Sequence, residues 1–216
     1  MGFFSKLFKK NKPEVEENTT KGTVEEFVSL IRVYYQASMA VNLGISNLNI
    51  LPDMALFKRM RADYLCESFM FIRIPRYTPS LIAEETGLKK YYFIDNGMRQ
   101  NILLPHSQDE GKLLESSVLL HLCRRCGELE KVTYFLKEKE CDFVLQHEDI
   151  VLQLIQVCWQ MEDAETRARE IAGLLEARKV THCDNLYIIT HHQEETIEQD
   201  GWTIHVVPAW KWMLTK

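Results

Sequence analysis

Apolar residues recur with two different spacings in the second half of the chain. At 110–126 and 163–178 they return every three or four positions, which predicts two amphipathic helices. Short apolar runs predict strands at 131–136, 141–146, 150–158, 185–190 and 203–207. A helix, a three-strand meander, a second helix and further strands make the order of an α/β domain. The pattern therefore predicts a mixed sheet with one helix on each side.

The first half of the chain has a more helical pattern. Thr23 and Glu26 match the capping-box pattern, which predicts a helix from there to about Val41. A second helix is expected to begin at Pro52 and to continue to about Cys66. Two strands are predicted to follow at 69–75 and 89–95, the second closed by a turn at Asn96 and Gly97.

Charge is distributed unevenly along the 216 residues. Residues 1–60 carry 8 Lys and Arg against 6 Asp and Glu, whereas residues 61–216 carry 18 against 25. An acidic body is a poor surface for non-specific nucleic-acid binding, which depends on neutralising phosphates. No apolar run approaches the ~18–20 residues of a membrane span, and no secretory leader is recognisable. We therefore expect a cytoplasmic protein without a membrane span.

The six cysteines are expected to be reduced thiols in such a compartment. Cys123 and Cys126 have the spacing of a metal or redox pair, but no second pair follows to complete a zinc site. They are predicted to be ordinary cysteines at a helix end.

Three polar residues occupy positions where the pattern predicts an apolar core. Glu115 shares a helical face with Val118 and Leu119, where a buried carboxylate is costly unless it is paired or binds a metal. Asp142 and Gln156 lie on two predicted strands joined by a short turn at 147–149. A turn there would place these two residues opposite each other across the ladder. Glu115, Asp142 and Gln156 are therefore the candidate metal ligands.

Several stretches in the same order resemble a known family. They are KKYYFIDNG (89–97), GKLLE (111–115), ECDFV (140–144), LIQV (154–157), ETRAREIAGL (165–174) and VVPAWKWML (206–214). Residues 63–216 are similar to the C-terminal region of a bacterial and archaeal family of AAA-type ATPases, in which a PD-(D/E)XK nuclease-like domain of unassigned function follows an ATPase and a winged helix. The resemblance implies an α/β fold of the restriction-endonuclease type, a mixed sheet flanked by helices.

The resemblance also implies a domain organisation. A basic tail and helical segment is expected at 1–60, a winged-helix remnant and linker at 61–100, and the nuclease-like domain at 101–216. Residues 1–60 resemble the start of a small helical protein of gut Bacteroidales. The G-x-x-x-x-G-K-[ST] phosphate loop is absent from the sequence, so no ATPase activity is expected.

In the resembling family the motif consists of Asp, then Glu or Gln, any residue and Lys, with a Glu from the preceding helix. Asp142, Gln156 and Glu115 match it, and in active members such groups hold Mg²⁺ or Mn²⁺, which activates water. Cys158 occupies the position of the motif lysine, and the loss of that lysine is expected to impair catalysis. The sequence offers three lysines as substitutes, at Lys112, Lys137 and Lys139.

Simpler roles exist for each candidate. Glu115 is favoured in the first turns of a helix without any metal. Asp142 is able to accept hydrogen bonds from backbone amides or from arginines near the hairpin, and Gln156 is able to pair with it and fix the strand register. Arg167, Arg169 and Glu170 match a helix of the resembling family. Ion pairs between residues three positions apart are expected among them, and the alternative is that Arg167 contacts DNA.

These observations favour a degenerate, non-catalytic nuclease-like module that acts in protein or nucleic-acid interaction. One alternative is a Mg²⁺- or Mn²⁺-dependent nuclease that hydrolyses phosphodiesters with Asp142, Gln156 and Glu115. Another is a truncated gene fusion with no selected function. Apolar surface left by the missing ATPase would also favour a homo-oligomer.

Overall fold

The computed structural model describes residues 66–102 and 109–215, which fall into two compact units. The described residues of the larger unit are 74–90 and 109–215, and those of the smaller unit are 66–73 and 91–102. The helices predicted between Thr23 and Cys66 lie outside the described residues, apart from the last position. All of the candidate site residues belong to the larger unit.

The larger unit contains a mixed sheet with strand order β3-β4-β5-β6-β8-β7. Its strands are β3 (Glu130–Leu136), β4 (Glu140–His147), β5 (Ile150–Val157), β6 (Leu186–Thr190), β7 (Glu195–Gln199) and β8 (Trp202–Pro208). The first three are antiparallel neighbours, β5, β6 and β8 are parallel, and β7 is an antiparallel edge strand. Five of these strands match the predicted ones. The sequence pattern did not predict β7.

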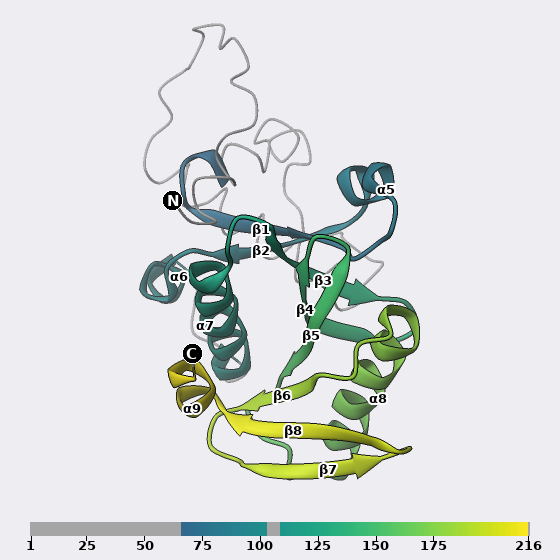
Figure 1. Cartoon of the computed structure of the whole chain (residues 1–216). Helices are drawn as coiled ribbons and strands as arrows, with labels where there is room; N and C mark the ends of the chain where they lie inside the picture. Colours follow the sequence, from purple (N-terminus) through teal and green to yellow (C-terminus); the bar gives the residue numbers. More distant parts are fainter. Residues whose placement is uncertain (1–65, 103–108, 216) are drawn as a thin grey trace, which may run out of the picture. The chain divides into compact units, whose positions relative to one another are not determined.

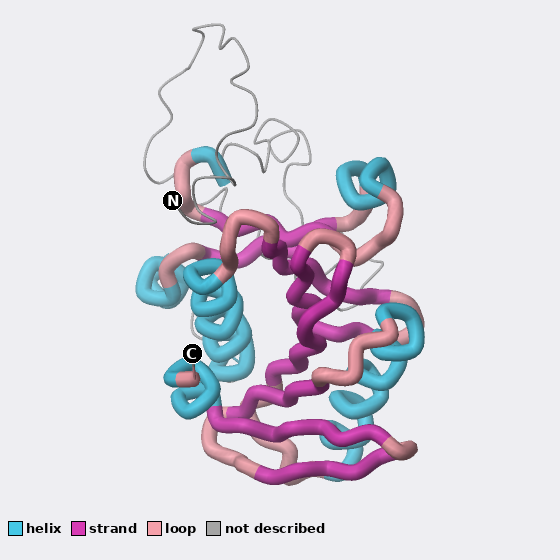
Figure 2. The backbone as a smooth tube through the Cα atoms, viewed as in Figure 1, coloured by secondary structure: helices cyan, strands magenta, loops and turns pink. Residues whose placement is uncertain are grey.

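Two long helices cover the opposite faces of this sheet, α7 (Asp109–Arg125) and α8 (Ala164–Thr181) (Figure 1). Leu154 and Ile155 are successive residues of β5 that point to opposite faces, and both are fully buried. The short helix α9 (Ala209–Leu214) packs beside α7 (Figure 2). The predicted mixed α/β architecture is confirmed, while its assignment to the restriction-endonuclease type stays a prediction. None of the helices in the described ranges is long and apolar enough to cross a membrane.

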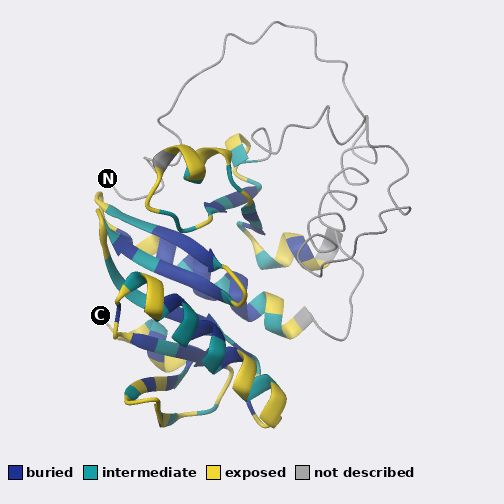
Figure 3. Cartoon of the chain, turned by 90° about the vertical axis from the view of Figure 1, so that its right-hand side faces the viewer, coloured by how far each residue is buried: buried dark blue, intermediate teal, exposed yellow. Residues whose placement is uncertain are grey.

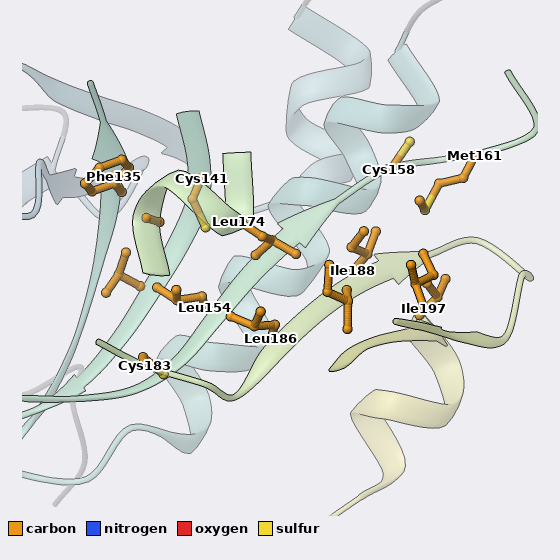
Figure 4. Packing of buried hydrophobic residues seen from close by; sticks show 14 residues of the cluster. Phe135, Cys141, Leu154, Cys158, Met161, Leu174, Cys183, Leu186, Ile188 and Ile197 are labelled. Atoms are coloured by element: carbon orange, nitrogen blue, oxygen red, sulfur yellow. The ribbon is translucent and has the colours of Figure 1, made fainter. Parts of the chain in front are cut away.

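The helix α8 packs on the sheet through an apolar core and approaches β4 most closely at a glycine. Leu154, Leu174 and Ile188 are among its fully buried members (Figure 4), and many of the buried residues of the unit lie on its central strands (Figure 3). At Gly173 a Cβ atom would lie 2.2 Å from the backbone oxygen of Glu140. The α8 backbone therefore lies directly against the start of β4, at a position that only glycine allows.

Residues 74–90 belong to the larger unit and run along β3. The Tyr77 amide donates to the carbonyl of Tyr134 at 2.6 Å, and the Tyr134 hydroxyl donates to the carbonyl of Leu88 at 3.1 Å. Between these contacts lies the helix α5 (Leu81–Thr86), whose first turn is capped by Ser80. These hydrogen bonds fix the chain at the point where it enters β2 (Lys89–Phe93), and so determine the position of Lys90.

The turn predicted at Asn96 and Gly97 is wrong. β1 (Phe71–Pro75) pairs with β2, and both strands cross the boundary between the units. Asn96 and Gly97 do not form a turn but begin the helix α6 (Asn96–Ile102). The reason is Asp95, whose carboxylate accepts from the Met98 amide at 2.6 Å and caps the helix. The derivation of residues 61–100 from a winged helix stays a prediction.

Candidate functional site

The structure brings the three predicted ligands together. Glu115 from α7 is 5% exposed, Asp142 from β4 is 9% exposed, and Gln156 from β5 is 6% exposed. The β4–β5 register pairs Phe143 with Ile155, so the next residues outward, Asp142 and Gln156, are neighbours across the ladder. The predicted turn and register are therefore confirmed.

Gln156 is held by three hydrogen bonds within the protein. Its Oε1 accepts from the Asp142 amide at 3.0 Å. Its Nε2 donates to the Glu140 carbonyl at 3.3 Å and to Glu170 Oε2 at 2.6 Å. Because one side chain joins β4, β5 and α8, Gln156 fixes the register of the strands and the position of the helix, as its structural alternative predicted.

Asp142 also contacts both backbone and side-chain donors. Its Oδ2 accepts from the Val157 amide at 3.0 Å, and its Oδ1 lies 3.4 Å from Lys90 Nζ. Burial, followed by the nearby Glu115 carboxylate, raises the pKa of Asp142 to about 7, although Lys90 and Lys112 oppose this shift. Burial and the neighbouring carboxylates therefore outweigh the two lysines in setting the pKa of this group.

Sequence reasoning missed Lys90, although its amino group lies among the carboxylates. Lys90 is 5% exposed, its Nζ lies 3.6 Å from Glu115 Oε1, and it also forms an ion pair with Glu140. One sequence signal was available. On a strand, Lys90 shares a face with Tyr92, which is also buried, so a cation lies where an apolar residue is expected.

The lysines considered as substitutes for the motif lysine differ in position. Lys112 Nζ lies 2.8 Å from Glu115 Oε2, one turn away on α7, and this carboxylate raises the Lys112 pKa. Lys139 lines the cavity next to the site, and Lys137 does not. Of the three, Lys112 therefore has the direct contact with a predicted ligand.

Cys158, at the motif lysine position, belongs to the apolar core. Its thiol donates to the backbone carbonyl of Gln160 at 3.0 Å, and it lies in the buried cluster with Met161 (Figure 4). Burial, followed by Glu170, raises the pKa of Cys158 to about 11. A neutral thiol here supplies neither the charge nor the reach of a lysine.

The cysteine pair at the end of α7 is also buried. Cys123 and Cys126 are free thiols, and burial raises the pKa of each to about 12. Thiols with such high pKa values are poor nucleophiles and poor metal ligands at neutral pH.

The arginines of α8 do not form the expected pair with spacing of three. Arg167 instead makes a bidentate ion pair with Glu195 of β7, at 2.6 and 2.8 Å. Arg169 pairs with its neighbour Glu170 at 2.6 Å, and Glu170, which is 5% exposed, also accepts from Gln156 Nε2. The expectation was wrong because both acidic partners are fixed by tertiary contacts that the helix spacing does not reveal.

A cavity of about 750 Å³ opens beside these residues. Six acidic side chains line it together with three basic ones, so its electrostatic character is acidic. The acidic residues are Glu110, Glu115, Glu138, Glu140, Asp142 and Glu170, and the basic residues are Lys112, Lys139 and Arg169.

Protein groups already contact the oxygen atoms that a metal ion would need. Both oxygens of Asp142 and both oxygens of Glu115 contact a lysine or a backbone amide, and Gln156 Oε1 accepts from the Asp142 amide. Among the described residues, no group of three His, Cys, Asp or Glu side chains is arranged to hold a metal ion. As arranged, these ligands do not fit Mg²⁺, which requires free oxygens in near-octahedral geometry.

Comparison with known proteins gives relatives without an assigned function. A family model described as a domain of unknown function (DUF8491) matches residues 1–64. The uncharacterized protein MJ1544 of Methanocaldococcus jannaschii is 32% identical over 161 residues, which cover 71% of this chain and 35% of the archaeal protein. The chain thus spans about a third of the length of that relative. No solved structure matches the chain.

The raised pKa of Asp142 predicts a pH-dependent effect of Asp142→Asn. The folded pKa of about 7 lies above the ordinary carboxyl value, so this group favours folding at low pH, and that contribution is lost as the pH rises through about 7. Asparagine retains an oxygen for the Val157 amide but does not ionise. Relative to the wild type, Asp142→Asn should therefore be more stable at pH 8 than at pH 5, measured from urea denaturation midpoints. An equal difference at both values would contradict this prediction.

Proposed function

We propose that the larger unit is a non-catalytic, nuclease-like module that binds a protein partner through the acidic cavity. The observation that carries the non-catalytic part of this proposal is that the Gln156 side chain is fully hydrogen-bonded within the protein. Its carboxamide joins two strands and α8 through hydrogen bonds to Asp142, Glu140 and Glu170, so it is a structural member and not a free ligand. The neutral thiol of Cys158, at the position of the motif lysine, supports the same conclusion.

The charge of the cavity favours a basic protein segment over nucleic acid. Carboxylates outnumber cationic side chains two to one on the cavity wall. A phosphate backbone would be repelled there unless divalent cations intervened, whereas lysine and arginine side chains would be attracted. Arg167, which was considered for DNA contact, is neutralised by Glu195.

The proposal is tested with the full chain in two parallel assays. The first incubates the protein with single- and double-stranded DNA and RNA in Mg²⁺ or Mn²⁺ and measures cleavage. The second measures binding of a lysine- and arginine-rich peptide and of an acidic peptide of equal length by fluorescence anisotropy, with a labelled DNA oligomer alongside. We expect no cleavage, and we expect the basic peptide to bind more tightly than the DNA.

A double variant with Glu110→Gln and Glu138→Gln serves as the control for the second assay. Both residues line the cavity and both lie outside the buried ion-pair cluster, so the fold should persist while binding of the basic peptide weakens. Metal-dependent cleavage that Asp142→Ala abolishes would instead establish the phosphodiesterase alternative. Preferential DNA binding would assign the module to nucleic acid, and no binding in any assay would favour a chain without a selected function.

A further inference from the structure

Lys90 places a buried ammonium group at the centre of the acidic cluster. It reaches Glu115 at 3.6 Å and Asp142 at 3.4 Å, and it pairs with Glu140. The ring of Tyr134 lies on another side, with its centroid 5.3 Å from Nζ. A lysine that is 5% exposed is tolerated only because these groups offset its desolvation.

The same oxygens would be the first ligands of a divalent cation. Asp142 Oδ1 and Glu115 Oε1 come from different elements and converge on one point, and that point is where Nζ lies. An ammonium and a metal ion cannot share it, because they repel each other and compete for the same lone pairs. Lys112 contacts Glu115 from the outside, with a side chain that is 45% exposed, so it leaves the centre to Lys90.

We propose that the Lys90 ammonium is the resident cation of this site and takes the place of a divalent metal. The inference rests on the proposed non-catalytic function and explains how the carboxylates persist without a metal. It follows that removing this one charge should create a divalent-cation site. The substitution Lys90→Met removes the ammonium and keeps most of the apolar stem.

The experiment measures the Tm of the full chain with and without millimolar MnCl₂ for the wild type, Lys90→Met and Lys112→Met. Lys112→Met is the matched control, because it removes a lysine from the same cluster without removing the central charge. We expect Mn²⁺ to raise the Tm of Lys90→Met by about 5 °C and to leave the other two nearly unchanged. Adding Asp142→Asn to Lys90→Met should abolish the response.

Two results would overturn the inference. One is an equal response to Mn²⁺ in the wild type, which would place a metal beside Lys90. The other is a folded Lys90→Met protein without any response. If Lys90→Met does not fold in metal-free buffer, Mn²⁺ should restore its far-UV circular dichroism. If Mn²⁺ does not restore the fold, the Tm measurement is repeated on Lys90→Met combined with Glu140→Gln, which carries one carboxylate fewer. A Tm response to Mn²⁺ in this double variant supports the inference, and its absence overturns it. Cleavage of DNA by the wild type would refute the proposed function, whereas a wild-type Tm response without cleavage would refute this inference alone.

Discussion

Replacing Gly173 with alanine should destabilise the larger unit by about 3 kcal/mol or more, because the new methyl group has no space. Its Cβ would lie 2.2 Å from the backbone oxygen of Glu140 and 3.4 Å from Gln156 Nε2. The obstacle is backbone within a sheet, which cannot rotate away as a side chain would. Relief therefore requires α8 to move off β4, which would also break the hydrogen bond between Gln156 and Glu170. Urea denaturation at neutral pH measures the loss.

The same substitution at Gly111 provides the control. Gly111 lies in the first turns of α7, and nothing is within 4 Å of a Cβ placed there. Alanine has the higher helix propensity, so Gly111→Ala should stabilise the protein by up to about 1 kcal/mol. Opposite signs for one chemical change would show that close packing of α8 on β4 is responsible. A loss below about 1 kcal/mol at Gly173 would indicate that the helix is free to shift.

Periodicity was sufficient to predict most of the larger unit, because its elements are long and have apolar faces. The helices α7 and α8 and five strands were predicted within a few residues of their observed ends. The strand β7 was missed because Glu195, Glu198 and Gln199 give it the composition of an acidic loop, and only Ile197 of this strand is buried. As an edge strand, β7 pairs only with β8 and buries a single apolar side chain. One apolar residue does not produce the alternating pattern from which strands are predicted.

Local sequence patterns were sufficient to predict three residues of the candidate site but not Lys90. Glu115 was conspicuous on an apolar helical face, and the short turn brought Asp142 and Gln156 together. Lys90 is 52 positions from Asp142, and no local pattern relates β2 to β4. The roles of the three predicted residues depend on Lys90 and Glu170, whose positions only the tertiary structure provides.

Exchanging the neutral motif residue for the acidic one with Gln156→Glu should cost about 3–5 kcal/mol at neutral pH, because it buries an unpaired charge. Gln156 Nε2 donates to Glu170 Oε2 at 2.6 Å and to the Glu140 carbonyl. A carboxylate oxygen in that place would face a second carboxylate and a carbonyl oxygen, and no donor would remain between them. Because protonation relieves this repulsion, the loss should shrink as the pH falls, and urea denaturation at pH 7 and pH 5 measures both effects.

The second-site change Glu170→Gln should recover much of this loss, since its amide can donate to the new carboxylate. Gln153→Glu is the control for the substitution itself, because Gln153 is a half-buried residue of the same strand, and a carboxylate that still reaches water costs less than a buried one. If Gln156→Glu were as stable as the wild type and gained stability from Mn²⁺, a metal site would be one substitution away and the motif would not be structurally committed. A large loss, rescued only by Glu170→Gln, would mean that the chain cannot accept a glutamate at this position without also changing α8.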